Sequence, residues 1–385
     1  MSLFEVRHQG RAQGMFQRAL ASDRVPHAYI LEGPEGVGRE LFAVGAAKVL
    51  LCSQPERLAA TEARVAEGFE KWRGKVTDAC GGCESCRAVE AGVHPDLHVV
   101  HREQIKQHPD AAVKARKGLF LGVDVVREFL LRWVANKPLL GRAKVFVVRE
   151  AEKMNAAAQN ALLKTLEEPP ATTFLFLLAT SAEALLPTVR SRCQVWSFGP
   201  LPADFVRARL AVESAGVSED DVALCATYSE GSLGAARRYV EDRLWEYSGA
   251  VAAMLGGLDE AGAQGAAKGM IDSAKELGGG YQKRDVDVSD TDAQRRGLKT
   301  LLGLVAMRYG AVLHHRAGCA EAVSGGRGGP SRHVALPAWL GSLSARGACD
   351  AIGAIATAER QLDLNANAQL CVEALLIRLG RLAGT

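Results

Sequence analysis

A glycine-rich turn between a strand pattern and a helical pattern is the feature that most constrains the fold of this chain. The letters HAYILE at 27–32 predict a buried strand, and LFAVGAAKVLL beginning at residue 41 has helical spacing. Between them the letters GPEGVG place three glycines, Gly33, Gly36 and Gly38. A strand, a glycine loop and a helix in this order direct backbone amides and a helix N-terminus toward one point. This is how many α/β proteins hold a phosphate.

The first 200 residues continue to alternate strand and helix patterns. Apolar runs predict further strands at 97–100, 145–149, 174–179 and 194–198, and helical spacing recurs at 123–136 and 155–168. Strands that alternate with helices predict a parallel α/β sheet.

Beyond about residue 201 the chain shows helical patterns only. Polar or glycine-rich stretches at 278–296 and 324–333 predict flexible loops in this helical part. Within the first domain, the stretch 53–79 predicts a helical insertion.

The glycine loop lacks the side chains that phosphoryl transfer needs. In the pattern G-x-x-x-x-G-K-[ST], the lysine reaches the β- and γ-phosphates and the hydroxyl binds Mg²⁺. Here Arg39 and Glu40 stand at those two positions, and a carboxylate at 40 would repel phosphate. ATPases with such a loop also end an apolar strand in an acidic pair, but the strand VFVV is followed by Arg149 and Glu150.

Both metal-binding positions are therefore replaced, and only Glu150 of the acidic pair remains. Because the metal neutralises charge that develops in phosphoryl transfer, the sequence predicts a degenerate loop that does not hydrolyse ATP. The simpler alternatives are a glycine turn with no nucleotide role and a solvated acid at position 150.

Three of the nine cysteines form a metal-binding pattern, Cys80-x2-Cys83-x2-Cys86. A tetrahedral zinc site needs four ligands, and Cys52, at the end of the predicted helix, is the natural fourth. His94 is the alternative fourth ligand, although His-Pro-Asp is typical of a turn. A ferredoxin-type iron–sulfur cluster would need another cysteine three residues on, where the chain has Glu. Four thiolates leave no open position, so the zinc would be structural.

Composition disfavours several classes of protein. Lys and Arg number 47 against 44 Asp and Glu, a net charge of +3, and aromatic residues make up 6%. Neither value favours strong DNA binding by the chain alone. The N-terminus has no apolar segment behind a basic start, and the most apolar long stretch, 174–186, is too short to span a bilayer. We therefore expect a cytoplasmic protein with no membrane contact.

Several segments carry a resemblance to a known family. They occur in this order over most of residues 1–200: HAYILEGPEGVG, CGGCESC, HPDL, KVFVVREAEKMNAAAQNALLKTLEEPPATTFLFLLAT and LLPTVRSRCQVWSF. Together they resemble the bacterial clamp-loader subunits of DNA polymerase III, which are AAA+ proteins, and most of all the delta-prime group. Near the C-terminus, ERQLDLNANAQLCVEALLIRL at 359–379 is similar to the last collar helices of that group.

The resemblance implies a three-part architecture. An α/β AAA+ P-loop-type module with a parallel sheet would occupy 1–200 and include a zinc module at about 52–86. A small helical lid would follow at 201–242, and an all-α collar for oligomerisation at 243–385. The family's zinc module has the same order, one cysteine and then C-x2-C-x2-C. This implies that the four cysteines named above bind zinc.

The resemblance also implies a function. Clamp loaders place the sliding clamp on primed DNA in replication, within the DNA-directed DNA polymerase holoenzyme, a nucleotidyltransferase complex. Delta-prime subunits commonly do not hydrolyse ATP, so we expect no intrinsic activity here. The implied partners are gamma/tau-like motor subunits, a delta subunit, the clamp and primer-template DNA. Two other functions stay open: an ATP-hydrolysing gamma/tau-like motor subunit, and a zinc-module DNA-binding protein with a vestigial loop.

Arg192, in Ser-Arg-Cys at 191–193, is the residue to which the resemblance gives a catalytic role. In this family it is an arginine finger that enters the ATP site of a neighbouring subunit, where the guanidinium fork fits phosphate oxygens. The alternative is an ordinary surface arginine. Thr180 falls at the sensor-1 position, where a strand-end cap is the simpler interpretation, and Arg237 lies in the sensor-2 region.

Overall fold

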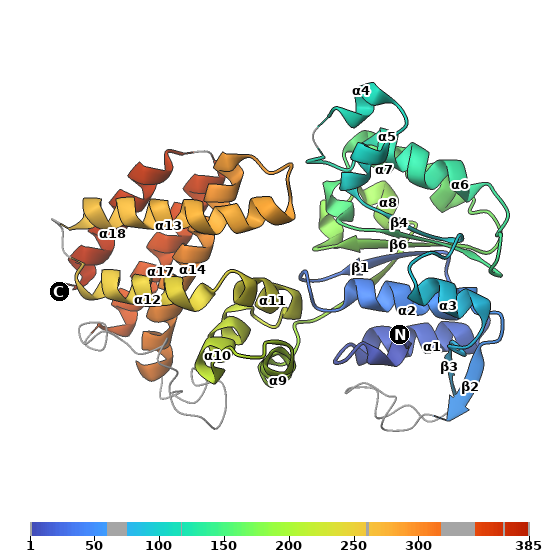
Figure 1. Cartoon of the computed structure of the whole chain (residues 1–385), viewed down its shortest axis with the longest axis horizontal. Helices are drawn as coiled ribbons and strands as arrows, with labels where there is room; N and C mark the ends of the chain where they lie inside the picture. Colours follow the sequence, from blue (N-terminus) through green and yellow to red (C-terminus); the bar gives the residue numbers. More distant parts are fainter. Residues whose placement is uncertain are drawn as a thin grey trace. The chain divides into compact units, whose positions relative to one another are not determined.

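The chain forms two compact units, residues 1–200 and 201–385. They are seen in a computed structural model (Figure 1), which describes residues 2–59, 75–116, 118–258, 262–316, 343–364 and 366–383. The two units are described separately below.

The first unit is built on a parallel sheet of five strands. The sheet order is β4-β5-β6-β1-β7, and every neighbouring pair is parallel. The strands are β1 (Ala28–Glu32), β4 (Leu97–Val100), β5 (Lys144–Val148), β6 (Thr173–Ala179) and β7 (Gln194–Ser197). This confirms the parallel α/β sheet that the apolar runs predict.

Helices cover both faces of this sheet (Figure 1). On one side lie α1 (Gly10–Ala21), α2 (Arg39–Leu51) and α3 (Glu84–Glu90). On the other lie α4 (Ala111–Lys114), α5 (Val123–Val126), α6 (Arg132–Val134), α7 (Ala156–Glu167) and α8 (Pro187–Arg190). Between α5 and α6 the chain makes a π-helical turn, Arg127–Leu131, and 3-10 turns occupy Leu3–Glu5, Arg102–Gln107, Ala151–Lys153 and Ala182–Ala184.

Alternate residues of each strand fill two separate cores, as the twofold period of a strand requires. Tyr29 and Trp196 lie 4.6 Å apart by ring centroids, and Trp196 meets Phe16 of α1 and Phe42 of α2 edge-on. Ile30 points the other way, into a fully buried cluster with side chains of α5 and α7.

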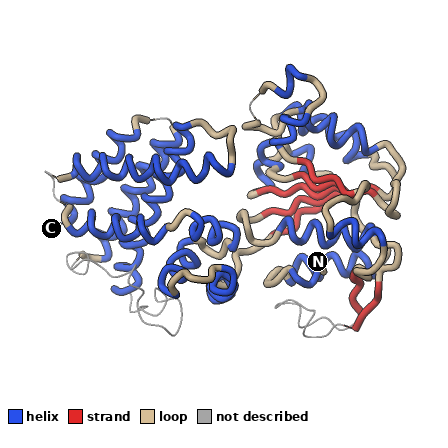
Figure 2. Tube along the Cα trace, in the orientation of Figure 1, coloured by secondary structure: helices blue, strands red, loops and turns tan. Residues whose placement is uncertain are grey.

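Part of the predicted helical insertion is instead a β-hairpin, so that prediction is wrong for these residues. β2 (Glu56–Ala59) and β3 (Lys75–Asp78) pair antiparallel and lie apart from the main sheet (Figure 2). The amide side chain of Gln17 ties β3 to α1: it donates to the Thr77 carbonyl at 2.8 Å and accepts from the Thr77 N–H at 2.7 Å. The Gln17 side chain thus bonds β3 in addition to the pairing that β2 provides. Residues 60–74 lie outside the described part.

The second unit contains only helices in its described residues, which confirms an all-helical C-terminal region. They are α9 (Ala203–Glu213), α10 (Glu219–Tyr228), α11 (Leu233–Glu241), α12 (Leu244–Gly256), α13 (Ala263–Arg284), α14 (Asp290–Arg316), α17 (Ala345–Asp363) and α18 (Ala368–Ala383). None of the described helices is long and apolar enough to cross a membrane.

The predicted loop at 278–296 is wrong, because most of it belongs to α13 and α14. Gly278 of this stretch and Gly297 just beyond it allow close packing of these two helices. A side chain on Gly278 would approach the Ala293 backbone to 2.8 Å, and one on Gly297 would approach the Ala274 carbonyl to 2.2 Å. The predicted loop at 324–333 lies outside the described residues.

Two contacts bind the small helices of this unit to its long ones. The Tyr228 hydroxyl donates to the Thr300 carbonyl at 2.6 Å, in space that Gly303 leaves open. At the end of α11, Asp242 accepts two bonds from the Arg284 guanidinium, at 2.8 and 2.7 Å. The segments predicted as lid and collar are therefore joined by specific side chains as well as by the chain.

Candidate functional site

The three glycines of the loop adopt backbone angles that favour glycine. It leaves β1 at Glu32, and Gly33, Gly36 and Gly38 all have positive φ, at 145, 78 and 103°. A side chain on Gly33 would lie 2.3 Å from the Phe198 carbonyl oxygen. Gly38 is the N-cap of α2, so the loop ends at a helix N-terminus.

The N-terminal segment ties this loop to the end of β7. Gln9 is only 5% exposed, and its amide nitrogen donates to the carbonyls of Val37, at 3.2 Å, and Gly199, at 2.8 Å. Its amide oxygen accepts the Gly199 N–H at 3.2 Å. The sequence does not mark Gln9, because a lone glutamine matches no motif.

Arg39 stands where a working loop has lysine, and it is 9% exposed. Its Nη1 has no hydrogen-bond partner among the described residues. Burial lowers the pKa of the guanidinium, and the nearby carboxylates of Glu152 and Glu35 partly offset this.

Glu40 and Arg149 form an ion pair across the loop. Arg149 Nε donates to Glu40 Oε1 at 3.0 Å, and Nη2 makes a second bond to the same oxygen. Glu40 comes from the first turn of α2 and Arg149 from the end of β5, and their side chains are 43% and 42% exposed. The Glu40 carboxylate is thus paired with a cation, which weakens the phosphate repulsion expected from the sequence. The pair joins the two positions that hold Mg²⁺ in working loops.

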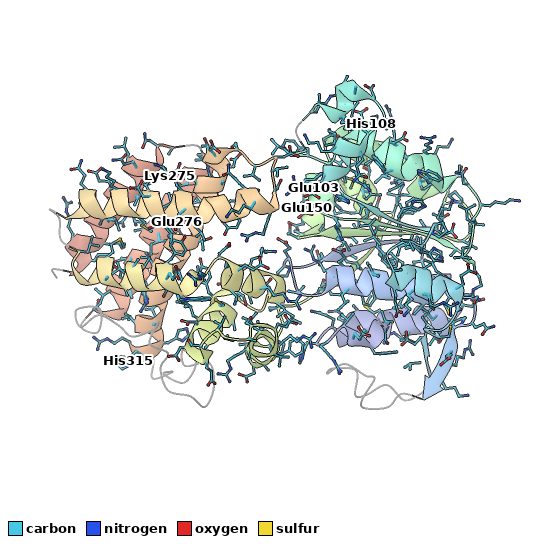
Figure 3. All side chains as sticks on the ribbon, viewed as in Figure 1. Glu103, His108, Glu150, Lys275, Glu276 and His315 are labelled. Atoms are coloured by element: carbon cyan, nitrogen blue, oxygen red, sulfur yellow. The ribbon has the colours of Figure 1, made fainter. Side chains whose placement is uncertain are left out.

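Glu150 has two basic partners of its own. Arg102 Nε donates to Glu150 Oε2 at 2.9 Å, and Lys153 donates to the other oxygen. Arg102 Nη2 also lies 3.7 Å from Glu103 Oε1. Figure 3 labels Glu103 and Glu150 in the first unit. Burial raises the pKa of Glu150, but Lys153 and Arg102 outweigh it and hold the pKa below the ordinary value. The residual acid of the motif is thus bound within a basic cluster.

The four predicted cysteines come together. The sulfurs of Cys52, Cys80, Cys83 and Cys86 all lie within 4.8 Å of one another. Cys52 lies 3.6 Å from Cys80 and 3.9 Å from Cys83, and Cys80 lies 4.0 Å from Cys86. A tetrahedron with Zn–S bonds of about 2.3 Å has sulfur–sulfur edges of about 3.8 Å. The arrangement therefore fits a zinc ion held by four thiolates.

Local structure explains how the cysteines are placed. Cys52 ends α2, and Cys83 is the N-cap of α3, where its sulfur accepts the Cys86 N–H at 3.4 Å. The Cys80 N–H donates to the Cys52 sulfur at 3.4 Å. Burial raises the pKa of Cys83, but bonds from Ser53 and the Cys86 amide outweigh it and bring the pKa to about 5.

His94 is not part of this cluster. Its Nε2 bonds Ser85 Oγ at 2.8 Å, and its Nδ1 accepts the Asp96 N–H at 3.0 Å, so both ring nitrogens are engaged. Ser85 Oγ in turn donates to the Leu51 carbonyl at 2.8 Å. Ser85 therefore links α3 to the end of α2, and His94 bonds this serine. Cys52 is the fourth sulfur of the cluster.

Arg192 lies just beyond α8, with its side chain 34% exposed. Nη1 donates to the Thr188 carbonyl at 2.9 Å and to Ser191 Oγ at 3.2 Å. Nη2 donates to Glu167 Oε1, at the end of α7, at 2.5 Å. The guanidinium is therefore partly open to solvent and held at one side by its own unit.

The two sensor candidates are placed differently. Thr180 is exposed directly after β6. Its interpretation as a residue that caps the strand end stays the simpler one. Arg237, in the second unit, gives a two-point ion pair to Glu213 at 2.7 and 2.8 Å.

Comparison with known proteins identifies relatives of the first unit. Residues 8–202 match the family model described as DNA polymerase III, delta subunit. DNA polymerase III subunit delta' of Escherichia coli K12 is 33% identical over 234 residues, which is 60% of this chain and 60% of that protein. The delta' subunit of Pseudomonas aeruginosa PAO1 is 36% identical over 176 residues, 46% of this chain and 44% of that protein. The chain thus spans about half the length of these relatives.

A second kind of relative matches the same chain. DNA polymerase III subunit gamma/tau of Mycobacterium bovis is 33% identical over 222 residues, 57% of this chain and 33% of that protein. Sequence identity therefore does not distinguish a delta' subunit from a gamma/tau subunit here. The individual site residues have to be compared instead.

Proposed function

The chain belongs to the DNA polymerase III delta subunit family and is delta-prime-like, and on that premise we propose that it is a clamp-loader subunit that does not hydrolyse ATP. It assembles with gamma/tau-like motor subunits and a delta subunit. The assembly places the sliding clamp on primer-template DNA. This subunit contributes Arg192 to the ATP site of a neighbouring motor subunit.

The Glu40–Arg149 ion pair is the observation that carries the first part of this proposal. Mg²⁺ bridges phosphate oxygens and neutralises their developing charge during phosphoryl transfer. A carboxylate and a guanidinium bound to each other offer the ion neither a hydroxyl nor a free acid. Glu150 is engaged as well, by Arg102 and Lys153, so it is poorly placed to prepare an attacking water.

The exposure of Arg192 supports the second part. Arginine keeps its charge and has five N–H donors in a planar fork, which suits phosphate oxygens. Bonds to Thr188, Ser191 and Glu167 use Nη1 and Nη2 at one side of the fork. Further N–H groups of the guanidinium stay available to a phosphate that a partner presents.

The cysteine cluster would hold zinc in a structural role. When bound, the ion supplies a fourfold cross-link between Cys52 at the end of α2 and the loop and helix that carry Cys80, Cys83 and Cys86. Four thiolates leave no position for water, so the cluster supports the fold and takes no part in chemistry.

A motor subunit is the second candidate, favoured by the similarity to gamma/tau. It would need Mg²⁺ ligands at 40 and 149, and the ion pair at those positions speaks against it. The DNA-binding alternative lacks support from charge, since the net charge is only +3.

The experiment compares the full chain with a variant that restores the motif, Arg39→Lys, Glu40→Thr and Arg149→Asp together. We expect the wild-type chain alone to release no phosphate from Mg-ATP and to show no Mg²⁺-dependent nucleotide binding. The restored variant should gain Mg²⁺-dependent binding. Phosphate release by the wild-type chain alone would contradict the proposal and make the protein a motor.

A further inference from the structure

We propose that Glu167 is a positioning residue for Arg192. The proposal rests on the proposed function, because it gives the arginine finger a support within its own subunit. It concerns a residue at the end of α7 that would touch neither the nucleotide nor the reacting phosphate.

The contact between the two residues fixes one side of the guanidinium. Glu167 Oε1 accepts from Arg192 Nη2 at 2.5 Å, while Nη1 donates to the Thr188 carbonyl at 2.9 Å. Because α8 binds Nη1 and α7 binds Nη2, the guanidinium of Arg192 has one preferred plane. Without Glu167, only bonds to residues of its own short helix and turn would hold the side chain.

Glu167 is itself carried by a rigid element. It is the last residue of α7, which Pro169 and Pro170 cannot continue because proline lacks an N–H and clashes with the preceding turn. Gln159 links α7 to the start of α8, since its amide oxygen accepts the Leu186 N–H at 2.7 Å. The carboxylate is therefore positioned relative to α8, the helix that leads to Arg192.

The geometry favours positioning over competition with phosphate. Glu167 is 49% exposed and bonds a single nitrogen, so water screens its charge. The Nε–H and the second Nη2 hydrogen of Arg192 are not used by the bonds to Glu167, Thr188 and Ser191. Catalytic groups lose rate steeply when they are displaced by about 1 Å, because the correct geometry must then be found by chance. By fixing the plane of the Arg192 guanidinium, Glu167 should therefore raise the rate of the chemical step.

The test uses the assembled clamp loader with the full chain as wild type, Glu167→Ala, Glu167→Gln, Arg192→Ala, or the double variant. Glu168→Ala is the matched control, an exposed neighbour at the C-cap of α7. ATP turnover is measured over a range of ATP concentrations with clamp and primed DNA present. Thermal melting of each free variant shows that folding is unchanged.

We expect Glu167→Ala to lower kcat about tenfold with KM for ATP little changed, as for an orientation defect. Glu167→Gln should recover part of the rate, since its amide oxygen still accepts a hydrogen bond. Glu168→Ala should behave as wild type, and Glu167→Ala should add nothing in the Arg192→Ala background.

Two results would overturn the proposal separately from the finger itself. If Arg192→Ala lowers turnover but Glu167→Ala leaves it unchanged, Glu167 has no positioning role. If Glu167→Ala raises turnover, the carboxylate competes with phosphate for the arginine. If Arg192→Ala has no effect, the arginine finger fails, and the role of Glu167 fails with it.

Discussion

Gly303 offers a test of how the small helices of the second unit are fixed to the long ones. A methyl group at this position would lie 2.1 Å from the Tyr228 hydroxyl and 3.0 Å from the ring carbon that bears it. Tyr228 would have to move, and its 2.6 Å bond to the Thr300 carbonyl would break. The Tyr228 hydroxyl belongs to α10 and the Thr300 carbonyl to α14, so this bond connects the two helices.

The expected magnitude for Gly303→Ala follows from three terms. Loss of the hydrogen bond costs about 1 kcal/mol, and overpacking costs about 1–3 kcal/mol. Replacing glycine inside a helix returns about 1 kcal/mol. We therefore expect the free energy of unfolding to fall by about 1–3 kcal/mol.

Gly310 is the matched control, because it lies in the same helix and, outside the backbone of that helix, no atom of the described residues lies within 4 Å of an added methyl group. Gly310→Ala should stabilise the protein by up to about 1 kcal/mol, so the two variants should differ in sign. Urea denaturation of the full chain followed by circular dichroism measures both. Equal stability of the two variants would refute the reasoning from close packing at Gly303.

Three further predictions concern the first unit. Because Glu40 and Arg149 are each more than 40% exposed, a double-mutant cycle with alanine should give a coupling energy of at most about 1 kcal/mol; a coupling of several kcal/mol would show that the pair is buried in solution. Cys83→Ser should release zinc and lower the melting temperature, and metal analysis of wild-type protein that finds no zinc would end this prediction. The pKa of Glu150 is lower in the folded than in the unfolded state. Its charge therefore stabilises the fold fully above the unfolded-state pKa, about 4.3. This stabilisation is lost as the pH falls through the folded-state pKa. Melting curves of wild type and Glu150→Gln should therefore converge on acidification, and a constant difference down to about pH 2 would contradict the assignment.

Much of the first unit can be predicted from local sequence, for a physical reason. A strand buried on both faces is a continuous apolar run, so β1, β5 and β6 stand out in the letters. The cysteine cluster is also local in its main part, since Cys80, Cys83 and Cys86 lie within one turn and the start of one helix.

The features that the sequence does not predict depend on tertiary contacts. Glu40 and Arg149 are 109 residues apart, and their pairing depends on β6 lying between β1 and β5 in the sheet. The glycines near 278 have the composition of a loop, but they lie in α13, where Gly278 allows close approach to α14. The hairpin β2–β3 is bonded at Thr77 by the side chain of Gln17, 60 residues earlier in the chain, which no propensity scale contains.

The proposed role of Arg192 in a neighbouring ATP site is tested by ATP hydrolysis by motor subunits reconstituted with the delta subunit, the clamp and primed DNA. The reaction is compared without this protein, with wild type, and with Arg192→Ala, and the protein alone serves as the blank. We expect no hydrolysis by the protein alone, and stimulation by wild type that Arg192→Ala loses. Equal stimulation by Arg192→Ala, or hydrolysis in the blank, would contradict this expectation.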